Sequence, residues 1–160
     1  MDQAQLQLLL DRTAISDTVI RYATGIDMRD WAAYRSCFTD DVEIDFTSWN
    51  GGEPSTMAAN DWVALVRATL SGFASTQHIS TNHVIAIDGN HATCVSYMQA
   101  QHYLPNAQGD SAFTLGGYYT NRLLRTAGGW KICGCRLTVT WSTGNRHVFE
   151  IAAQRRASRA

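Results

Sequence analysis

The 160-residue sequence predicts an α+β domain in which helices come first and a long antiparallel sheet follows. Apolar residues recur at three- and four-residue spacings in the first half of the chain, as amphipathic helices require. From His78 onward, β-branched and alternating segments are separated by short turn signals, which is typical of a meander. The length fits one domain large enough to bury a core of its own.

The helical part divides into three predicted helices. The first covers residues 5–25, the second is a short helix over about 31–38, and the third runs over 61–72 with Asn60 as its N-cap. The apolar stripe expected to bury the first helix begins with three leucines: Leu6, Leu9 and Leu10.

The sheet is expected to start with an alternating strand over residues 42–46. Asp88-Gly89-Asn90 is a hairpin signal between two later strands, and His78 lies just ahead of the first of them, at a strand entrance. The strands predicted after residue 80 are 81–88, 92–104, 112–125 and 130–141.

Composition excludes several classes of partner. A net charge of −1 with 17% charged residues gives no electrostatic case for nucleic acid or for an anionic membrane surface. No apolar run approaches the roughly 20 residues of a membrane span, and the N-terminus lacks the features of a signal peptide, so we expect a cytoplasmic protein. Four scattered cysteines are expected to be free, buried thiols: Cys37, Cys94, Cys133 and Cys135.

Three residues are candidates for chemistry before any relative is considered. The imidazole of His78 can take and return a proton near neutral pH. Tyr22 and Asp27 lie five residues apart at the end of the first helix and could point into one cavity. Each also has a structural alternative: a histidine that hydrogen-bonds at a strand end, a core aromatic and a loop cap. Histidines such as His78 and His83 do not follow a recognised metal-ligand spacing, so no metal is expected.

Several short stretches, in this order and spacing, resemble scytalone dehydratase and, more broadly, the SnoaL-like branch of the nuclear-transport-factor-2-like superfamily. They are Asp27-Met28-Arg29-Asp30-Trp31, Glu43 to Trp49, Thr76-Gln77-His78, and Gly129 to Gly134 with Trp141 and Phe149. The resemblance covers roughly residues 5–150. It implies a cone-shaped α+β barrel, a curved antiparallel sheet wrapped by about three helices around one deep pocket.

The resemblance also implies roles for particular residues. Asp27 and His78 match a catalytic dyad in which the carboxylate orients the ring while the other ring nitrogen takes a proton from carbon. His102 falls near a second histidine of scytalone dehydratase, and Tyr22 matches a tyrosine of bile-acid 7α-dehydratase. Arg136 matches a basic pocket position of a hexachlorocyclohexane dehydrochlorinase.

The pocket wall is expected to bind substrate through Phe46, Trp49, Tyr119 and Phe149. Two tyrosines of scytalone dehydratase are replaced here by Ile26 and Phe46, so both phenol hydroxyls are missing and a more apolar substrate is expected. The candidate donors to a developing enolate are Tyr22, Tyr118 and Tyr119.

We expect residues 1–144 to form the domain and residues 145–160 to form a lid followed by a frayed tail. The function expected is a cofactor-independent lyase of the dehydratase type, acting on a small hydrophobic cyclic, polyketide-like or steroid-like substrate. An isomerase or cyclase of the same fold, and a non-catalytic protein that binds a hydrophobic ligand, stay open as alternatives. Related proteins are often dimers or trimers, so a homo-oligomer is expected.

Overall fold

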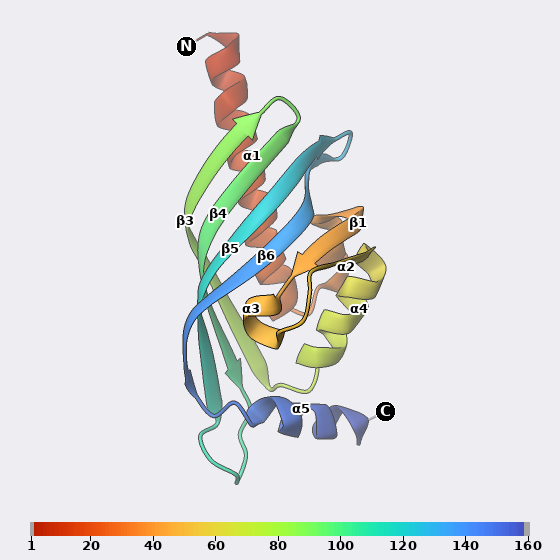
Figure 1. Ribbon diagram of the computed structural model, residues 1–160, viewed down its shortest axis with the longest axis vertical. Coiled ribbons are helices and arrows are strands. Elements are labelled where there is room, and N and C mark those ends of the chain that lie inside the picture. The colour runs from red at the N-terminus through yellow and green to blue at the C-terminus, as the bar shows by residue number, and fades with distance from the viewer. Residues whose placement is uncertain (1, 159–160) are drawn as a thin grey trace.

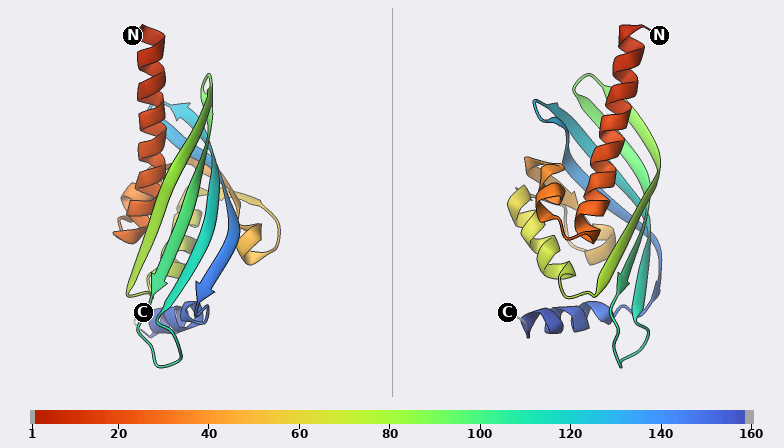
Figure 2. Two further views of the ribbon diagram at one scale, coloured as in Figure 1. Left: turned by 90° about the vertical axis from the view of Figure 1, so that its left-hand side faces the viewer. Right: turned by 180° about the vertical axis from the view of Figure 1, so that it is seen from behind.

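A curved sheet with helices gathered on its inner side makes up the computed structural model, which describes residues 2–158 (Figures 1 and 2). The helices are α1 (Gln3–Asp27), α2 (Trp31–Ser36), α3 (Thr47–Asn50), α4 (Ala59–Leu70) and α5 (Val148–Ala157). The strands are β1 (Phe38–Asp45), β2 (Ser55–Ala58), β3 (Ser75–Asp88), β4 (His91–Tyr103), β5 (Ala112–Thr126) and β6 (Gly129–Gly144).

The six strands form one unclosed sheet in the order β2-β1-β6-β5-β4-β3. The predicted α+β cone is therefore confirmed, and the meander from β3 to β6 is antiparallel throughout. One pairing differs from the prediction, because β1 runs parallel to β6 with Ile44 beside Cys135. These two strands are far apart in the chain, so no tight hairpin forces them into the antiparallel direction.

Strand β3 begins at Ser75, not near residue 81, so His78 lies inside the strand opposite Ala100. The sequence hides this part of the strand because its inward side chains are polar. A bulge at Asn82, whose φ is +55°, shifts the alternation by one residue and returns apolar side chains to the inner face. The hairpin after β3 is confirmed, and its Gly89 has the positive φ that such a turn requires.

Helix α1 is anchored to the sheet by a partly buried ion pair. Arg125 donates from its two terminal nitrogens to the two carboxylate oxygens of Asp11 at 2.5 and 2.7 Å, and the indole N–H of Trp130 donates to the same carboxylate. The Arg125 hydrogen bonds hold the pKa of Asp11 at about 2, against burial, which acts in the opposite direction. The buried side of α1 downstream includes Ile15 and Val19, each contributing about 1.5–3 kcal/mol.

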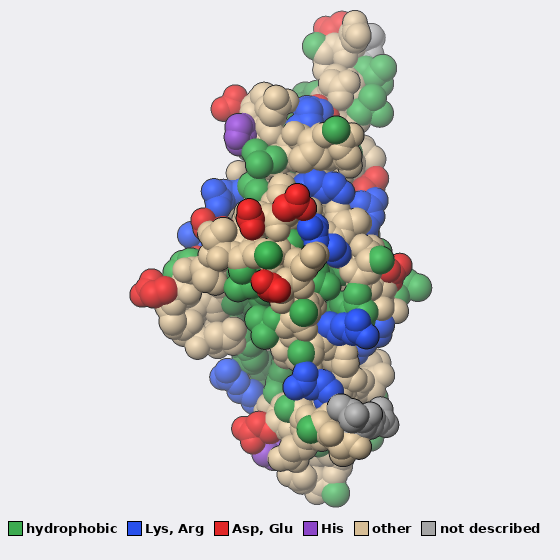
Figure 3. All heavy atoms as spheres, turned by 90° about the vertical axis from the view of Figure 1, so that its right-hand side faces the viewer, with side chains coloured by type: hydrophobic (Ala, Val, Ile, Leu, Met, Phe, Trp, Pro, Cys, Tyr) green, Lys and Arg blue, Asp and Glu red, His purple; other side chains and the backbone are tan. Residues whose placement is uncertain are grey.

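The first two turns of α1 extend past the end of the sheet (Figures 1 and 2). The leucine stripe predicted to bury this helix is therefore exposed at its start, with Leu9 and Leu10 about half accessible, because no strand lies opposite them. Hydrophobic side chains are visible at this upper end of the molecule in Figure 3.

The other two predicted helices are present, but their bounds, and the N-cap of the second of them, differ from the prediction. Helix α4 begins at Ala59, and Asn60, predicted as its N-cap, instead accepts a hydrogen bond from Arg35 Nε at 2.6 Å. The short elements α3 and β2 lie between the predicted strand over 42–46 and the predicted helix over 61–72, where the sequence predicts no helix or strand. The four cysteines are free, and three of them are buried while Cys133 is partly exposed.

The C-terminal segment is helical through Ala157, so Arg155 and Arg156 belong to α5, whereas Arg159 of the expected frayed tail lies outside the described residues. Within residues 2–158, no helix combines the length and apolar character needed to cross a lipid bilayer.

Candidate active site

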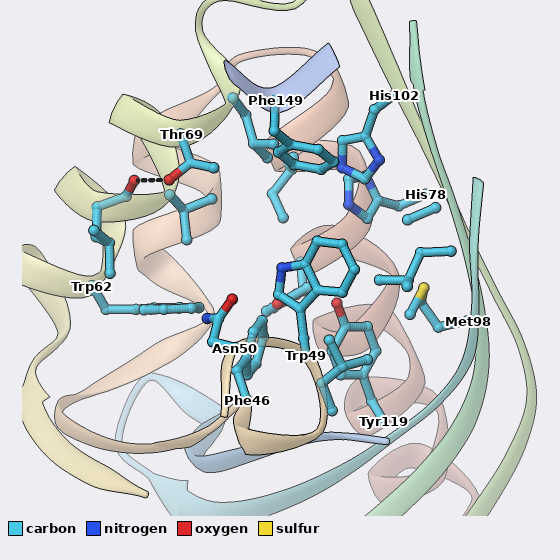
Figure 4. A pocket seen from close by; sticks show the side chains of 18 residues that line it. Phe46, Trp49, Asn50, Trp62, Thr69, His78, Met98, His102, Tyr119 and Phe149 are labelled. Atoms are coloured by element: carbon cyan, nitrogen blue, oxygen red, sulfur yellow. Dashed lines mark hydrogen bonds between the residues drawn. The ribbon is translucent and has the colours of Figure 1, made fainter. Parts of the chain in front are cut away.

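One cavity of about 220 Å³ opens between the inner face of the sheet and helices α1, α3, α4 and α5 (Figure 4). Most of its wall is apolar or aromatic, and a few polar groups point into it. Eight of the nine residues predicted for catalysis or substrate binding, all except Arg136, line it or hold a residue that does. They are Tyr22, Asp27, Phe46, Trp49, His78, His102, Tyr119 and Phe149.

Asp27 and His78 meet through two polar contacts, although 51 residues separate them. Nδ1 of His78 lies 2.7 Å from Asp27 Oδ1, and the backbone N–H of His78 donates to Oδ2 at 2.6 Å. An ionised carboxylate only accepts, so the proton of this pair sits on Nδ1 and Nε2 keeps a free lone pair. The His78 side chain is 8% exposed and lines the cavity. This geometry is that of an oriented general base.

Asp27 is the last residue of α1, where the helix dipole disfavours a negative charge. Burial also acts to raise the pKa of its carboxyl, but the hydrogen bonds and charge of His78, together with a hydrogen bond from Thr76, hold that pKa below its ordinary value. The Thr76 hydroxyl donates to Asp27 Oδ1 at 2.9 Å. The carboxylate therefore stays ionised beside the ring.

His102, on β4, lies next to His78 at one end of the cavity, with ring centroids 5.8 Å apart (Figure 4). Burial, reinforced by the neighbouring His78, lowers the pKa of His102 to about 3. Its Nδ1 is buried without a hydrogen-bond partner in the described part of the chain. His102 is thus a neutral imidazole beside the dyad, able to exchange hydrogen bonds with a ligand but not to carry a charge at neutral pH.

Tyr22 and Tyr119 form a second polar region of the wall, and their rings meet edge to face at 5.4 Å. Burial raises the pKa of both hydroxyls, that of Tyr22 well above its ordinary value. Both phenols therefore stay protonated at neutral pH and can donate a hydrogen bond to an oxygen of a bound molecule.

Aromatic side chains from three other segments close the cavity. Phe46 follows β1, Trp49 lies on α3 and Phe149 lies on α5 (Figure 4). Trp49 and Phe149 contact each other with centroids 5.7 Å apart, and the guanidinium of Arg146 lies 4.1 Å from the Trp49 ring. Phe149 also contacts His102 at 4.8 Å. The last helix therefore contributes directly to the wall next to the two histidines.

Arg136 is not part of this cavity, which corrects the expected pocket position. Its side chain is 61% exposed, and its Nε donates to Asp45 Oδ2 at 2.6 Å. Neighbouring residues on β6 alternate between the two faces of the sheet, so Leu137 lines the cavity while Arg136 points away from it.

The sequence did not single out Thr76, Arg29 and Asn50 as site residues. Thr76 could have been found, because it lies two residues before His78 and side chains two apart in a strand share a face. Arg29 donates to the Thr76 hydroxyl at 3.2 Å, a contact that no local pattern encodes. Asn50 lies in α3, a helix that the sequence does not predict, and lines the cavity.

His83 does not line the cavity, and both of its ring nitrogens lie within hydrogen-bond distance of serine hydroxyls. Its Nδ1 is 2.7 Å from the hydroxyl of Ser16, and its Nε2 is 3.0 Å from that of Ser80. Across residues 2–158, no three His, Cys, Asp or Glu side chains come together in a group able to hold a metal ion.

Comparison with known proteins fits this architecture. The model of the SnoaL-like domain matches residues 7–136. The chain belongs to the SnoaL-like family. The Kfla4162 protein from Kribbella flavida is 33% identical, with a TM-score of 0.85 over 89% of this chain and 99% of that one. No curated protein matches the sequence.

Solved structures of lower identity share the fold. A type 2 hexachlorocyclohexane dehydrochlorinase is 20% identical, with a TM-score of 0.75 over 88% of this chain and 93% of that one. A candidate scytalone dehydratase from Novosphingobium aromaticivorans is also 20% identical, with a TM-score of 0.74 over 86% and 89% of the two chains. The resemblance inferred from short sequence stretches is therefore confirmed at the level of family and fold.

Proposed function

We propose that this SnoaL-like protein is a cofactor-independent lyase of the dehydratase type, acting on a small hydrophobic cyclic ketone. The observation that carries the proposal is the Asp27–His78 pair at the wall of an otherwise apolar cavity. Two structurally similar proteins, a dehydrochlorinase and a candidate scytalone dehydratase, are named for eliminations, which supports the same reaction class.

In the proposed reaction, Nε2 of His78 removes the proton from the carbon next to the substrate carbonyl. The electron pair of that C–H bond forms the enolate, and Tyr22 or Tyr119 donates a hydrogen bond to its oxygen. The enolate then re-forms the carbonyl and expels the β-hydroxyl group, which takes the proton from His78 and leaves as water. Asp27 stabilises the imidazolium between the two transfers. The enzyme is unchanged at the end.

The size and lining of the cavity restrict the substrate class. A volume of about 220 Å³ lies below the roughly 300–1,000 Å³ typical of sites for drug-sized ligands. This favours a one- or two-ring polyketide-like compound over a four-ring steroid. Ile26 and Phe46 make the wall apolar at positions where scytalone dehydratase has phenol hydroxyls, so the ring should carry few polar substituents.

The test offers cyclic β-hydroxy ketones of one or two rings and follows loss of water by absorbance. Replacing His78 with Ala or Asp27 with Asn should reduce turnover by at least about 100-fold, the lower range for general-base catalysis, without unfolding the protein. His91→Ala, an exposed histidine at the start of β4, is the matched control and should keep full activity. Equal activity of His78→Ala and wild type would contradict the proposal.

The same apolar replacements at Ile26 and Phe46 favour a second candidate, a protein that binds a hydrophobic ligand without converting it. Binding can be followed by the fluorescence of Trp49, which lies in the cavity wall. Saturable binding with no turnover of any β-hydroxy ketone, in wild type and variants alike, would favour this second function.

A further inference from the structure

Arg29 occupies a backbone position that usually belongs to glycine. It follows Met28, the C-cap of α1, and its φ is +58°. Left-handed residues just after a helix are commonly glycine, because a Cβ makes that conformation unfavourable. Arg29 therefore adopts a disfavoured conformation beside Asp27, and such conformations often occur at functional sites.

The half-buried guanidinium of Arg29 turns back toward the dyad. Its Nη1 donates to the carbonyl of Ile26 at 3.2 Å and to the hydroxyl of Thr76, also at 3.2 Å. Thr76 lies on β3, two residues before His78, and is 8% exposed. A chain of hydrogen bonds thus runs from Arg29 through Thr76 to Asp27 and His78.

The direction of this chain is fixed by the donors available. A guanidinium has only N–H donors, so the Thr76 oxygen must accept from Arg29. The single hydroxyl proton of Thr76 is then free to point to Asp27 Oδ1, 2.9 Å away. That oxygen also accepts from His78 Nδ1, so Thr76 and His78 share one acceptor.

We propose that Arg29 and Thr76 are positioning residues of the dyad: Arg29 orients the Thr76 hydroxyl, which holds the Asp27 carboxylate ionised and limits how strongly it binds the His78 proton. The idea rests on the proposed function for its catalytic meaning, but not for its structural test. It predicts that Thr76 lowers the pKa of Asp27 and weakens the Asp27–His78 hydrogen bond, and that Arg29 acts mainly through Thr76.

Charges on the neighbouring elements do not replace this chain. Besides Arg29, whose charge also acts on Asp27, the titratable groups facing this carboxylate are His78 on β3, His102 on β4 and Tyr119 on β5. Burial keeps His102 and Tyr119 neutral at pH 7, since the pKa of His102 is lowered to about 3 and that of Tyr119 is raised. His78 is itself the partner of Asp27, which leaves Arg29 and Thr76 to adjust the pair from outside.

The experiment compares Thr76→Val with Thr76→Ser in full-length protein by NMR. At pH 7, the Nδ1 proton of His78 should move downfield in Thr76→Val, because Asp27 Oδ1 then accepts from His78 alone. The Asp27 carboxyl 13C signal should titrate about one pH unit higher, the size expected for losing a hydrogen bond to a charged group. Thr76→Ser should match wild type, as should Thr114→Val, a threonine of equal exposure elsewhere in the sheet.

The variant Arg29→Gly distinguishes an effect of Arg29 on the Asp27 carboxylate from an effect on the stability of the fold. Glycine relieves the left-handed backbone, so the denaturation midpoint should stay level or rise. The pKa of Asp27 should nevertheless rise in Arg29→Gly. When Arg29→Gly is added to Thr76→Val, the additional rise should be less than half of the rise that Arg29→Gly causes alone. An equal effect in both backgrounds would mean that Arg29 acts directly through its charge, which would overturn the chain through Thr76.

Two results would overturn the proposal as a whole: an unshifted Nδ1 proton in Thr76→Val, or the same shift in Thr76→Ser. Neither readout depends on turnover. If the NMR shifts occur but no variant or wild type dehydrates a β-hydroxy ketone, the positioning holds and the proposed function fails. If turnover is present but Thr76→Val leaves the NMR signals unchanged, the positioning proposal fails and the proposed function stands.

Discussion

At the residue scale, the site depends on a carboxylate kept ionised where its surroundings disfavour charge. Asp27 ends a helix and is 19% exposed, yet His78 and Thr76 supply three hydrogen bonds to its two oxygens. His102 is the opposite case, an imidazole kept neutral because burial disfavours its cation. Two histidines with different surroundings thus stand side by side, one paired with a carboxylate and one uncharged.

The neutral state of His102 predicts how stability changes with pH. Its pKa of about 3 in the folded protein lies below the roughly 6.5 of an unfolded histidine. As the pH falls, the unfolded chain therefore binds a proton at this histidine before the folded protein does. The stability that the folded protein gains from this difference is complete above about pH 6.5 and is lost as the pH falls toward 3. His83, whose pKa burial also lowers, acts in the same direction.

Replacing His102 with Gln should therefore reduce the loss of unfolding free energy between about pH 6.5 and 4, without abolishing it. Urea unfolding at a series of pH values measures the effect. His91→Gln, at an exposed histidine at the start of β4, is the control. An unchanged slope in His102→Gln would mean that His102 is charged in the folded protein.

At the scale of elements, α5 is packed as part of the core while it also closes the cavity. Val148 and Ala152 are fully buried, and Phe149 between them contacts His102. The helix sits against Gly72, just after α4, so closely that a Cβ there would lie 2.0 Å from the carbonyl oxygen of Ala152. Whether the segment also moves as a lid stays a prediction.

Gly72→Ala should push α5 away from α4 and displace Phe149. We expect a loss of about 1–3 kcal/mol in unfolding free energy, as for other overpacked sites, together with weaker ligand binding. Denaturant unfolding and Trp49 fluorescence titration measure the two effects. Gly128→Ala is the matched control, since the nearest atoms to its new Cβ would lie 3.7 Å away. Equal behaviour of the two variants would argue against a close α4–α5 contact.

At the scale of the molecule, the chain order of helices and strands was predictable because periodicity and turn signals are local. The strands β4, β5 and β6 begin and end within a few residues of their predicted bounds. The start of β3 was not predictable in this way. Its inward side chains at Thr76, His78 and Ser80 are polar because they serve the site or its surroundings, so the strand lacks an apolar alternation.

The candidate site was only partly predictable for a related reason. Asp27 and His78 could be paired by resemblance to the family, but their contact joins the end of α1 to β3 across 51 residues. Arg136 was misplaced because a single-residue difference in strand register decides which face a side chain occupies. Arg29 was missed because its role depends on a left-handed backbone that the sequence does not suggest for arginine.

The central claim, that His78 removes a proton from carbon with the help of Asp27, is tested most directly by hydrogen exchange in deuterated water. A two-ring ketone without a β-hydroxyl group, such as 1-tetralone, can exchange its α-proton but cannot lose water. NMR then reports proton abstraction alone. Wild type should exchange the α-proton, His78→Ala should be slower by at least about 100-fold, and the Asp27→Asn/His78→Ala double variant should be little worse than His78→Ala. Exchange that survives in His78→Ala at the wild-type rate would contradict the account.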